Sequence, residues 1–128
     1  MGRYELRLSF SYDTDSIGYQ SNRNRTLQTL YENNIGNNIM LSDDSHANWV
    51  SDLVWLDHAD YDPHAGKGSV GVEFGGTAVS SPSPYGQNIS IAMSVNASNH
   101  LVAANQELQW SEIYYRGIYE PIPNCEVG

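Results

Sequence analysis

Short apolar segments, each soon interrupted by glycine, proline or asparagine, constrain the fold of this chain most. Over residues 69–74 apolar side chains occupy every second position, and this period of two predicts a strand. Residues 4–10 alternate in the same way and predict another strand, while the apolar run at residues 39–41 predicts a short buried one. Residues 50–56 are apolar but fit either a strand or a helix. The nine tyrosines of the chain also favour β structure.

Helical spacing is clearest over residues 22–33, where apolar side chains recur at i, i+3 and i+4. Asn22 or Asn24 could cap the start of this helix. Residues 33–38 are rich in asparagine and glycine, which tolerate the left-handed conformation that ends helices.

The second half of the chain offers weaker patterns. Residues 75–86 are rich in glycine, serine and proline and predict a long loop. Residues 99–112 predict a second helix, and residues 113–119 predict a final strand. The prolines within residues 121–124 then prevent its continuation.

The charge balance excludes several classes of partner. The chain of 128 residues has 6 Lys and Arg against 15 Asp and Glu, a net charge of −9, and Lys67 is its only lysine. Binding to nucleic acid or to an anionic membrane needs a surplus of basic residues. No apolar run approaches the roughly 18–20 residues that span a bilayer, and the first residues lack the apolar core of a signal peptide. The length predicts one domain.

The most informative cluster follows the predicted strand at residues 39–41. It contains Asp43, Asp44, His46 and Asn48. Carboxylate and amide oxygens with one imidazole suit a divalent or ferric ion, because these are ligands that such ions accept. Two alternatives stay open on spacing alone: a solvated acidic loop, and an Asx turn in which Asp44 caps its own loop.

Other candidates are less specific. His58, Asp60, Asp62 and His64 form a second polar cluster, but the glycine placement and closing glutamate of a calcium loop are missing, so a surface loop is the better interpretation. Cys125 has no cysteine partner in the chain. A phosphate cradle in residues 75–77 is poorly supported, because no lysine follows these residues. Three glycosylation sequons, at Asn24, Asn88 and Asn96, are compatible with a secreted origin without establishing it.

Four blocks of sequence resemble the C-terminal part of PhoD-like alkaline phosphatases, within the calcineurin-like metallophosphatases. They are Gly18–Leu27 (GYQSNRNRTL), Ser42–Leu53 (SDDSHANWVSDL), Val72–Pro82 (VEFGGTAVSSP) and Tyr115–Gly117 (YRG). The resemblance covers residues 18–119. Residues 1–17 would then be a divergent N-terminal segment and residues 120–128 a divergent tail.

The resemblance implies hydrolysis of phosphate mono- and diesters at a polynuclear metal centre, with iron and calcium as the metals. It implies Asp44 and His46 as metal ligands, with Asn48 and Asp43 as candidates for supporting the ligands or contacting substrate. The family's fold is a four-layer α/β sandwich of two mixed sheets. This chain is expected to hold a C-terminal portion of it, an α/β unit with a mixed sheet, one or two helices, and uncovered strand edges.

Two departures from the family pattern shape the functional expectation. The family's early ligand blocks have no counterpart in residues 1–17, and its glycine before the ligand aspartate is Asp43 here, where the added charge would repel a phosphoester. We therefore expect a truncated C-terminal fragment that is inactive alone, and we leave open whether the isolated chain binds metal ions or none. The alternative is a non-catalytic binding or structural remnant of the same fold. Many family members are secreted, but the sequence fixes neither localisation nor oligomeric state.

Overall fold

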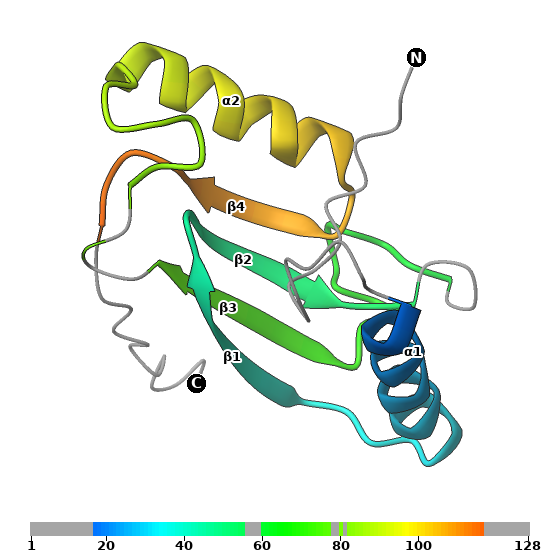
Figure 1. Cartoon of the computed structure of the whole chain (residues 1–128). Helices are drawn as coiled ribbons and strands as arrows, with labels where there is room; N and C mark the ends of the chain where they lie inside the picture. Colours follow the sequence, from blue (N-terminus) through cyan, green and yellow to red (C-terminus); the bar gives the residue numbers. More distant parts are fainter. Residues whose placement is uncertain (1–16, 56–59, 78–79, 81, 117–128) are drawn as a thin grey trace, which may run out of the picture.

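The computed structural model describes residues 17–55, 60–77, 80 and 82–116, and these form two helices and one four-stranded sheet (Figure 1). The strand predicted over residues 4–10, His58 and Cys125 lie outside the described residues. In chain order the elements are α1 (Ile17–Glu32), β1 (Asn38–Ser45), β2 (Asn48–Leu53), β3 (Gly71–Thr77), α2 (Ile91–Ala104) and β4 (Leu108–Glu112).

The sheet is mixed and open, with strand order β1-β3-β2-β4. β3 pairs in parallel with β1 and antiparallel with β2, and β2 pairs antiparallel with β4. The chain thus leaves β1, reverses into β2, and returns through residues 54–70 to place β3 between them. The expected α/β architecture with a mixed sheet and two helices is confirmed.

The hydrophobic core is small and lies where α1 meets one end of the sheet. Leu27 of α1 packs with Leu53 and Val70, and each of the three is at most 7% exposed. Tyr31 strengthens this contact, because its hydroxyl donates to the carbonyl of Gly68 at 2.5 Å and accepts the backbone N–H of Trp55 at 3.2 Å. α1 is therefore fixed to the loop before β3 by both packing and hydrogen bonds.

Three expectations for the first half of the chain need correction. α1 begins at Ile17, so Asn22 and Asn24 lie within the helix and do not cap it. The run at residues 39–41 is a strand, but it is not buried, because β1 is an edge strand of the described sheet and Ile39 and Leu41 are 71% and 79% exposed. The sequence left residues 50–56 open between a strand and a helix, and the residues up to Leu53 form strand β2. The predicted helix stop is confirmed, with Asn34 and Asn37 both at positive φ.

The second half departs further from expectation. The predicted helix over residues 99–112 is confirmed for residues 99–104, which belong to α2, and is wrong for residues 108–112, which form β4. The predicted final strand over residues 113–119 is wrong for the described residues 113–116, which follow β4. Ser90 caps α2 by accepting the backbone N–H of Met93 at 3.2 Å, a start signal that precedes the predicted helix by nine residues. Neither helix in the described part of the chain is long and apolar enough to cross a bilayer.

Candidate active-site edge of the sheet

The candidate residues gather at the edge of the sheet where the parallel strands β1 and β3 end. Asp43 and Asp44 are among the last three residues of β1, and His46 follows the strand directly. The β1–β3 register shifts between Ser42 and Ser45, so β1 carries one more residue than β3 over this interval. Such a bulge re-aims the strand's side chains. The side chains of Asp43 and Asp44 lie outside what the structure describes.

His46 is exposed, and its ring is oriented by one hydrogen bond. Its Nδ1 lies 2.8 Å from the backbone carbonyl oxygen of Pro82. A carbonyl oxygen can only accept, so Nδ1 must carry the proton. In the neutral ring Nε2 then keeps its lone pair. This is the arrangement found in histidines that bind a metal through Nε2 while a backbone carbonyl holds the other nitrogen.

Asn48 is buried, with 5% of its surface exposed, and its amide joins three segments. Its Oδ1 accepts the backbone N–H of Thr77 at 3.1 Å, and its Nδ2 donates to the carbonyl of Tyr115 at 2.9 Å. Both ends of the amide are thus engaged with backbone. Asn48 fixes the end of β3 and the chain after β4 relative to the segment that carries His46.

Two charged residues that the sequence analysis did not single out lie beside this edge. Glu112 closes the turn after β4, because its Oε1 accepts the backbone N–H groups of Tyr114 and Tyr115 at 2.6 and 3.0 Å. Arg116 donates to the carbonyl of Tyr114 at 3.3 Å. The YRG block had signalled Arg116 only as part of a strand. The structure instead places it in the segment that Asn48 holds.

Glu73 is the most unusual charged residue in the described sheet. It lies on the central strand β3, opposite Met40 and Ser51 of the neighbouring strands, and none of its surface is exposed. Neither carboxylate oxygen has a hydrogen-bond partner among the described residues. Burial raises the pKa of Glu73, while the nearby Ser42 hydroxyl, which lacks good hydrogen-bond geometry, and the charge of Arg23 oppose the rise.

Gly75 is needed for packing and does not cradle a phosphate. It faces Trp49 across the β2–β3 pair, and a Cβ at Gly75 would overlap the indole ring of Trp49. The expected Gly-rich loop therefore begins later than residue 75, because Gly75 and Thr77 both belong to β3.

The second polar cluster is a surface loop, as the sequence favoured. Asp60 pairs with Lys67 at 2.8 Å, and Asp62 accepts the backbone N–H of His64 at 2.9 Å. All four of these residues are exposed. This loop lies at the opposite end of the sheet from His46, because it joins the last residue of β2, Leu53, to the first residue of β3, Gly71.

A third polar cluster, not predicted from the sequence, ties that loop to the sheet. The Tyr61 hydroxyl donates to Asp52 at 2.6 Å, and Gln109 of β4 donates to the same carboxylate at 3.1 Å. Burial and the adjacent carboxylate raise the pKa of Tyr61. The tyrosine therefore remains protonated and structural.

At the candidate edge the structure describes the side chain of His46 but not the carboxylates of Asp43 and Asp44. Among the side chains that it does describe, no three from His, Cys, Asp or Glu are grouped closely enough to hold an ion. His46 has the donor chemistry of one ligand, through Nε2. A polynuclear centre needs ligands from several strand ends.

A comparison with known protein families agrees with the resemblance seen in these residues. A family model described as PhoD-like phosphatase matches residues 3–124 of the chain. The match spans nearly the whole sequence, and the chain belongs to the PhoD-like phosphatase family. No curated protein and no solved structure matches it.

Replacing Asn48 by alanine should destabilise the fold by about 1–3 kcal/mol, because the Thr77 N–H and the Tyr115 carbonyl would lose their buried partner. Urea denaturation followed by tryptophan fluorescence would measure this. The matched control is Asn99→Ala at an exposed position of α2, where the change should stay within about 0.5 kcal/mol. Equal losses in the two variants would contradict the tethering role.

Glu73→Gln should stabilise the protein at pH 7.5, by roughly 1 kcal/mol or more, because it removes a buried carboxylate that lacks a partner. The folded protein holds the Glu73 proton more tightly than the unfolded chain does, so stability falls as pH rises from the unfolded pKa through the higher folded pKa. The gain should therefore shrink toward pH 4.5. Urea midpoints at both pH values test this, with Glu32→Gln on exposed α1 as control. A gain of equal size at the two pH values would refute the assignment.

Proposed function

We propose that this chain supplies the Asp44–His46 portion of a metal-dependent phosphoester hydrolase site. Asp44 and His46 would bind the metal, Asn48 would position their segment, and Asp43 would lie beside the substrate. The observation that carries the proposal is the hydrogen bond from His46 Nδ1 to the Pro82 carbonyl, which leaves Nε2 with a lone pair at the end of a parallel strand. Family membership supports a phosphoester as the substrate class. Iron and calcium are proposed as the metals because the sequence resemblance implies them.

The chain's own residues would act here by orientation and charge. The Pro82 carbonyl restricts rotation of the His46 ring, and the amide of Asn48 keeps β3 and residue 115 in place around it. Arg116 is the only described arginine or lysine in the segment that Asn48 holds, and it could attract an anionic ester to a protein whose net charge is −9. Asp43 would act in the opposite direction and weaken substrate binding.

A non-catalytic remnant of the fold is the second candidate. In that case Asn48 and Glu112 would serve only to hold backbone, as their hydrogen bonds do. The two candidates differ in whether His46 binds a metal.

The tautomer of His46 gives a direct check on the observation behind the proposal. Long-range ¹H–¹⁵N NMR spectra at pH 8 should show His46 protonated at Nδ1, whereas His64 and His100, which are exposed, should favour the usual Nε2–H form. An Nε2–H tautomer at His46 would remove the main support for this ligand.

Metal titration separates the two candidate functions. With Co²⁺ as a spectroscopic probe, His46→Ala should weaken binding to the whole chain at least tenfold, whereas His100→Ala should leave it unchanged. Unchanged binding in His46→Ala would favour the remnant.

In the same samples, iron and calcium should give no turnover of an aryl phosphate above the buffer rate, because one strand end cannot complete the centre. Turnover that disappears in His46→Ala would contradict the expected inactivity.

A further inference from the structure

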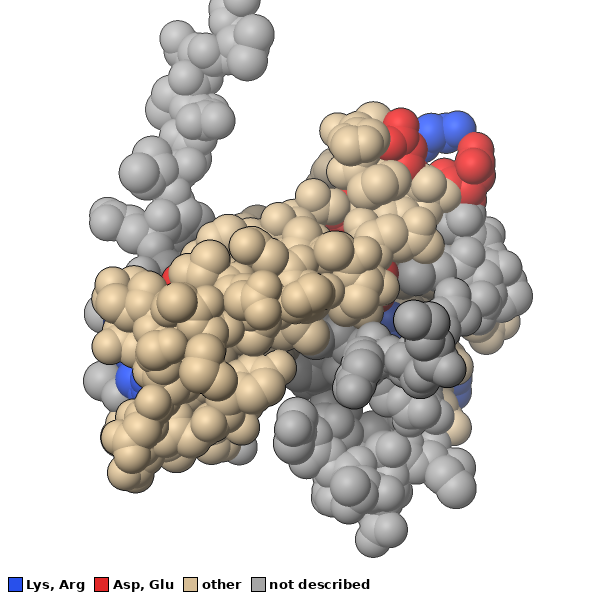
Figure 2. Space-filling model, turned by 90° about the horizontal axis from the view of Figure 1, so that it is seen from above, with Lys and Arg blue, Asp and Glu red and all other residues tan. Residues whose placement is uncertain are grey.

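The stretch of sequence that contains α2 carries no Asp, Glu, Lys or Arg, and Glu112 of β4 lies beside only one side of the helix. Between Glu73 and Glu107 the sequence contains no Asp, Glu, Lys or Arg, although the chain as a whole has a net charge of −9. Figure 2, viewed from the α2 side, shows a broad surface without charged residues, which appear only toward its margins. α1, by contrast, contains Arg23, Arg25 and Glu32.

The burial pattern of α2 is the reverse of that expected for a surface helix. Its buried residues are Ser94 and Ser98, whereas Ile91, Met93 and Val95 are 48%, 64% and 51% exposed. A helix of a monomeric protein usually turns its apolar stripe toward the core. α2 therefore exposes apolar surface that the described residues of its own chain do not cover.

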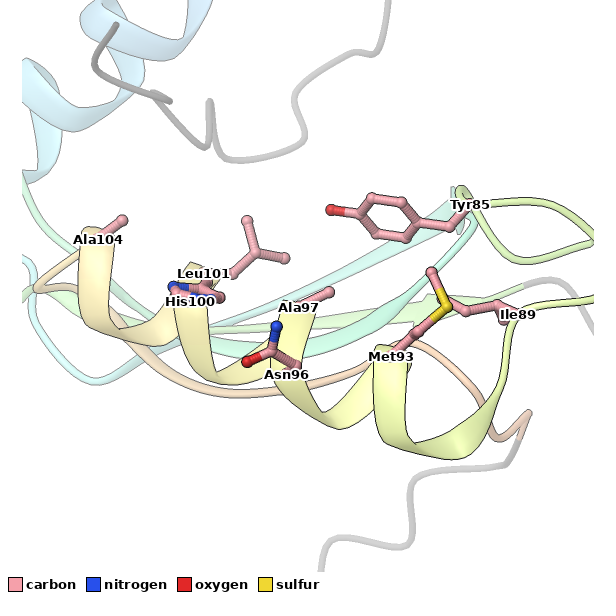
Figure 3. Close-up of a pocket in the computed structure, with 8 residues that line it drawn as sticks. All are labelled: Tyr85, Ile89, Met93, Asn96, Ala97, His100, Leu101 and Ala104. Atoms are coloured by element: carbon pink, nitrogen blue, oxygen red, sulfur yellow. The ribbon is translucent and has the colours of Figure 1, made fainter. Parts of the chain in front are cut away.

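Part of this surface is a groove that can receive another chain. Met93, Ala97, Leu101 and Ala104 follow one side of α2, and Tyr85 stands across from them (Figure 3). The groove has a volume of about 370 Å³. Asn96 and His100 lie along the same side and offer polar groups at its margin.

We propose that this groove binds a second copy of the chain, with α2 of each copy packed against α2 of the other. In a two-fold dimer the same surface lies on both sides of the contact, so any charged patch would face like charge. Two copies with a net charge of −9 repel each other over most of their surface. The groove side of α2 adds no like charges to such a contact and offers exposed apolar area to bury. The inference is independent of metal binding at His46.

The size of the helix limits the strength of this dimer. The 14 residues of α2 span about 21 Å at 1.5 Å per residue. One such helix covers less than the roughly 800 Å² per partner of a standard interface. The dimer should therefore be weak, with a Kd on the order of 100 µM, which corresponds to a small interface at the low end of specific complexes.

Sedimentation equilibrium on the whole 128-residue chain, from about 10 µM to 1 mM, tests the proposal. Met93→Glu should raise the Kd at least tenfold. Asn96→Lys is the sharper variant, because it lowers the net negative charge and so reduces overall repulsion, yet places like charges in the groove. It should also weaken the dimer. Asn24→Glu and Asn24→Lys on exposed α1 are the matched controls and should change the Kd less than threefold.

Salt adds an independent readout. Raising NaCl from 0.02 to 0.3 M screens the repulsion between two anionic copies, so the dimer should strengthen, whereas an ionic interface would weaken. A chain that stays monomeric to 1 mM would overturn the proposal. So would a dimer that is insensitive to both groove variants, or one that Asn96→Lys strengthens. Because Met93 and Asn96 are exposed, we expect both variants to fold as the unchanged chain does, and circular dichroism melts check this.

Discussion

The two hydrogen bonds of the Asn48 amide hold together the end of the sheet that carries the candidate metal ligands. β3 reaches that edge from the middle of the sheet, and residues 113–116 reach it from beyond β4. Without a common anchor these segments would be joined there only by strand pairing. Asn48 gives each a buried partner, and His46 stands two residues away, oriented by a carbonyl from a third segment. The candidate site is thus built on backbone contacts more than on side-chain packing.

The stability of the unit has an uneven basis. Among the described residues, one cluster of buried apolar side chains lies at the contact between α1 and one end of the sheet, around Leu27, Leu53 and Val70. Ile113, which follows β4, is also fully buried, in the segment that Asn48 holds. Elsewhere the buried side chains of the sheet include Ser51 and the unpartnered Glu73, and a buried carboxylate costs stability. Apolar burial therefore contributes at both ends of the sheet, whereas its centre carries polar groups.

Sequence patterns predicted the elements that bury one apolar face and failed for the part of the chain that does not. The i, i+4 spacing around Leu27 located α1, and alternation located β3, because burial of one face produces both patterns. The first part of α2, residues 91–98, was not predicted, because α2 buries serines and so reverses the usual pattern. At the site, the motif placed His46 at a strand end, but no sequence rule could reveal the Pro82 carbonyl, because that contact joins residues far apart in the chain.

The close fit of the Trp49 indole against the backbone of Gly75 has an evolutionary consequence. Position 75 cannot acquire any side chain while position 49 keeps its large ring, and loss of the ring alone would open a void beside the strand. The two positions, on neighbouring strands, are therefore locked to one another. A lineage can leave this pair only by changing the tryptophan first and the glycine second, so each constrains the drift of the other.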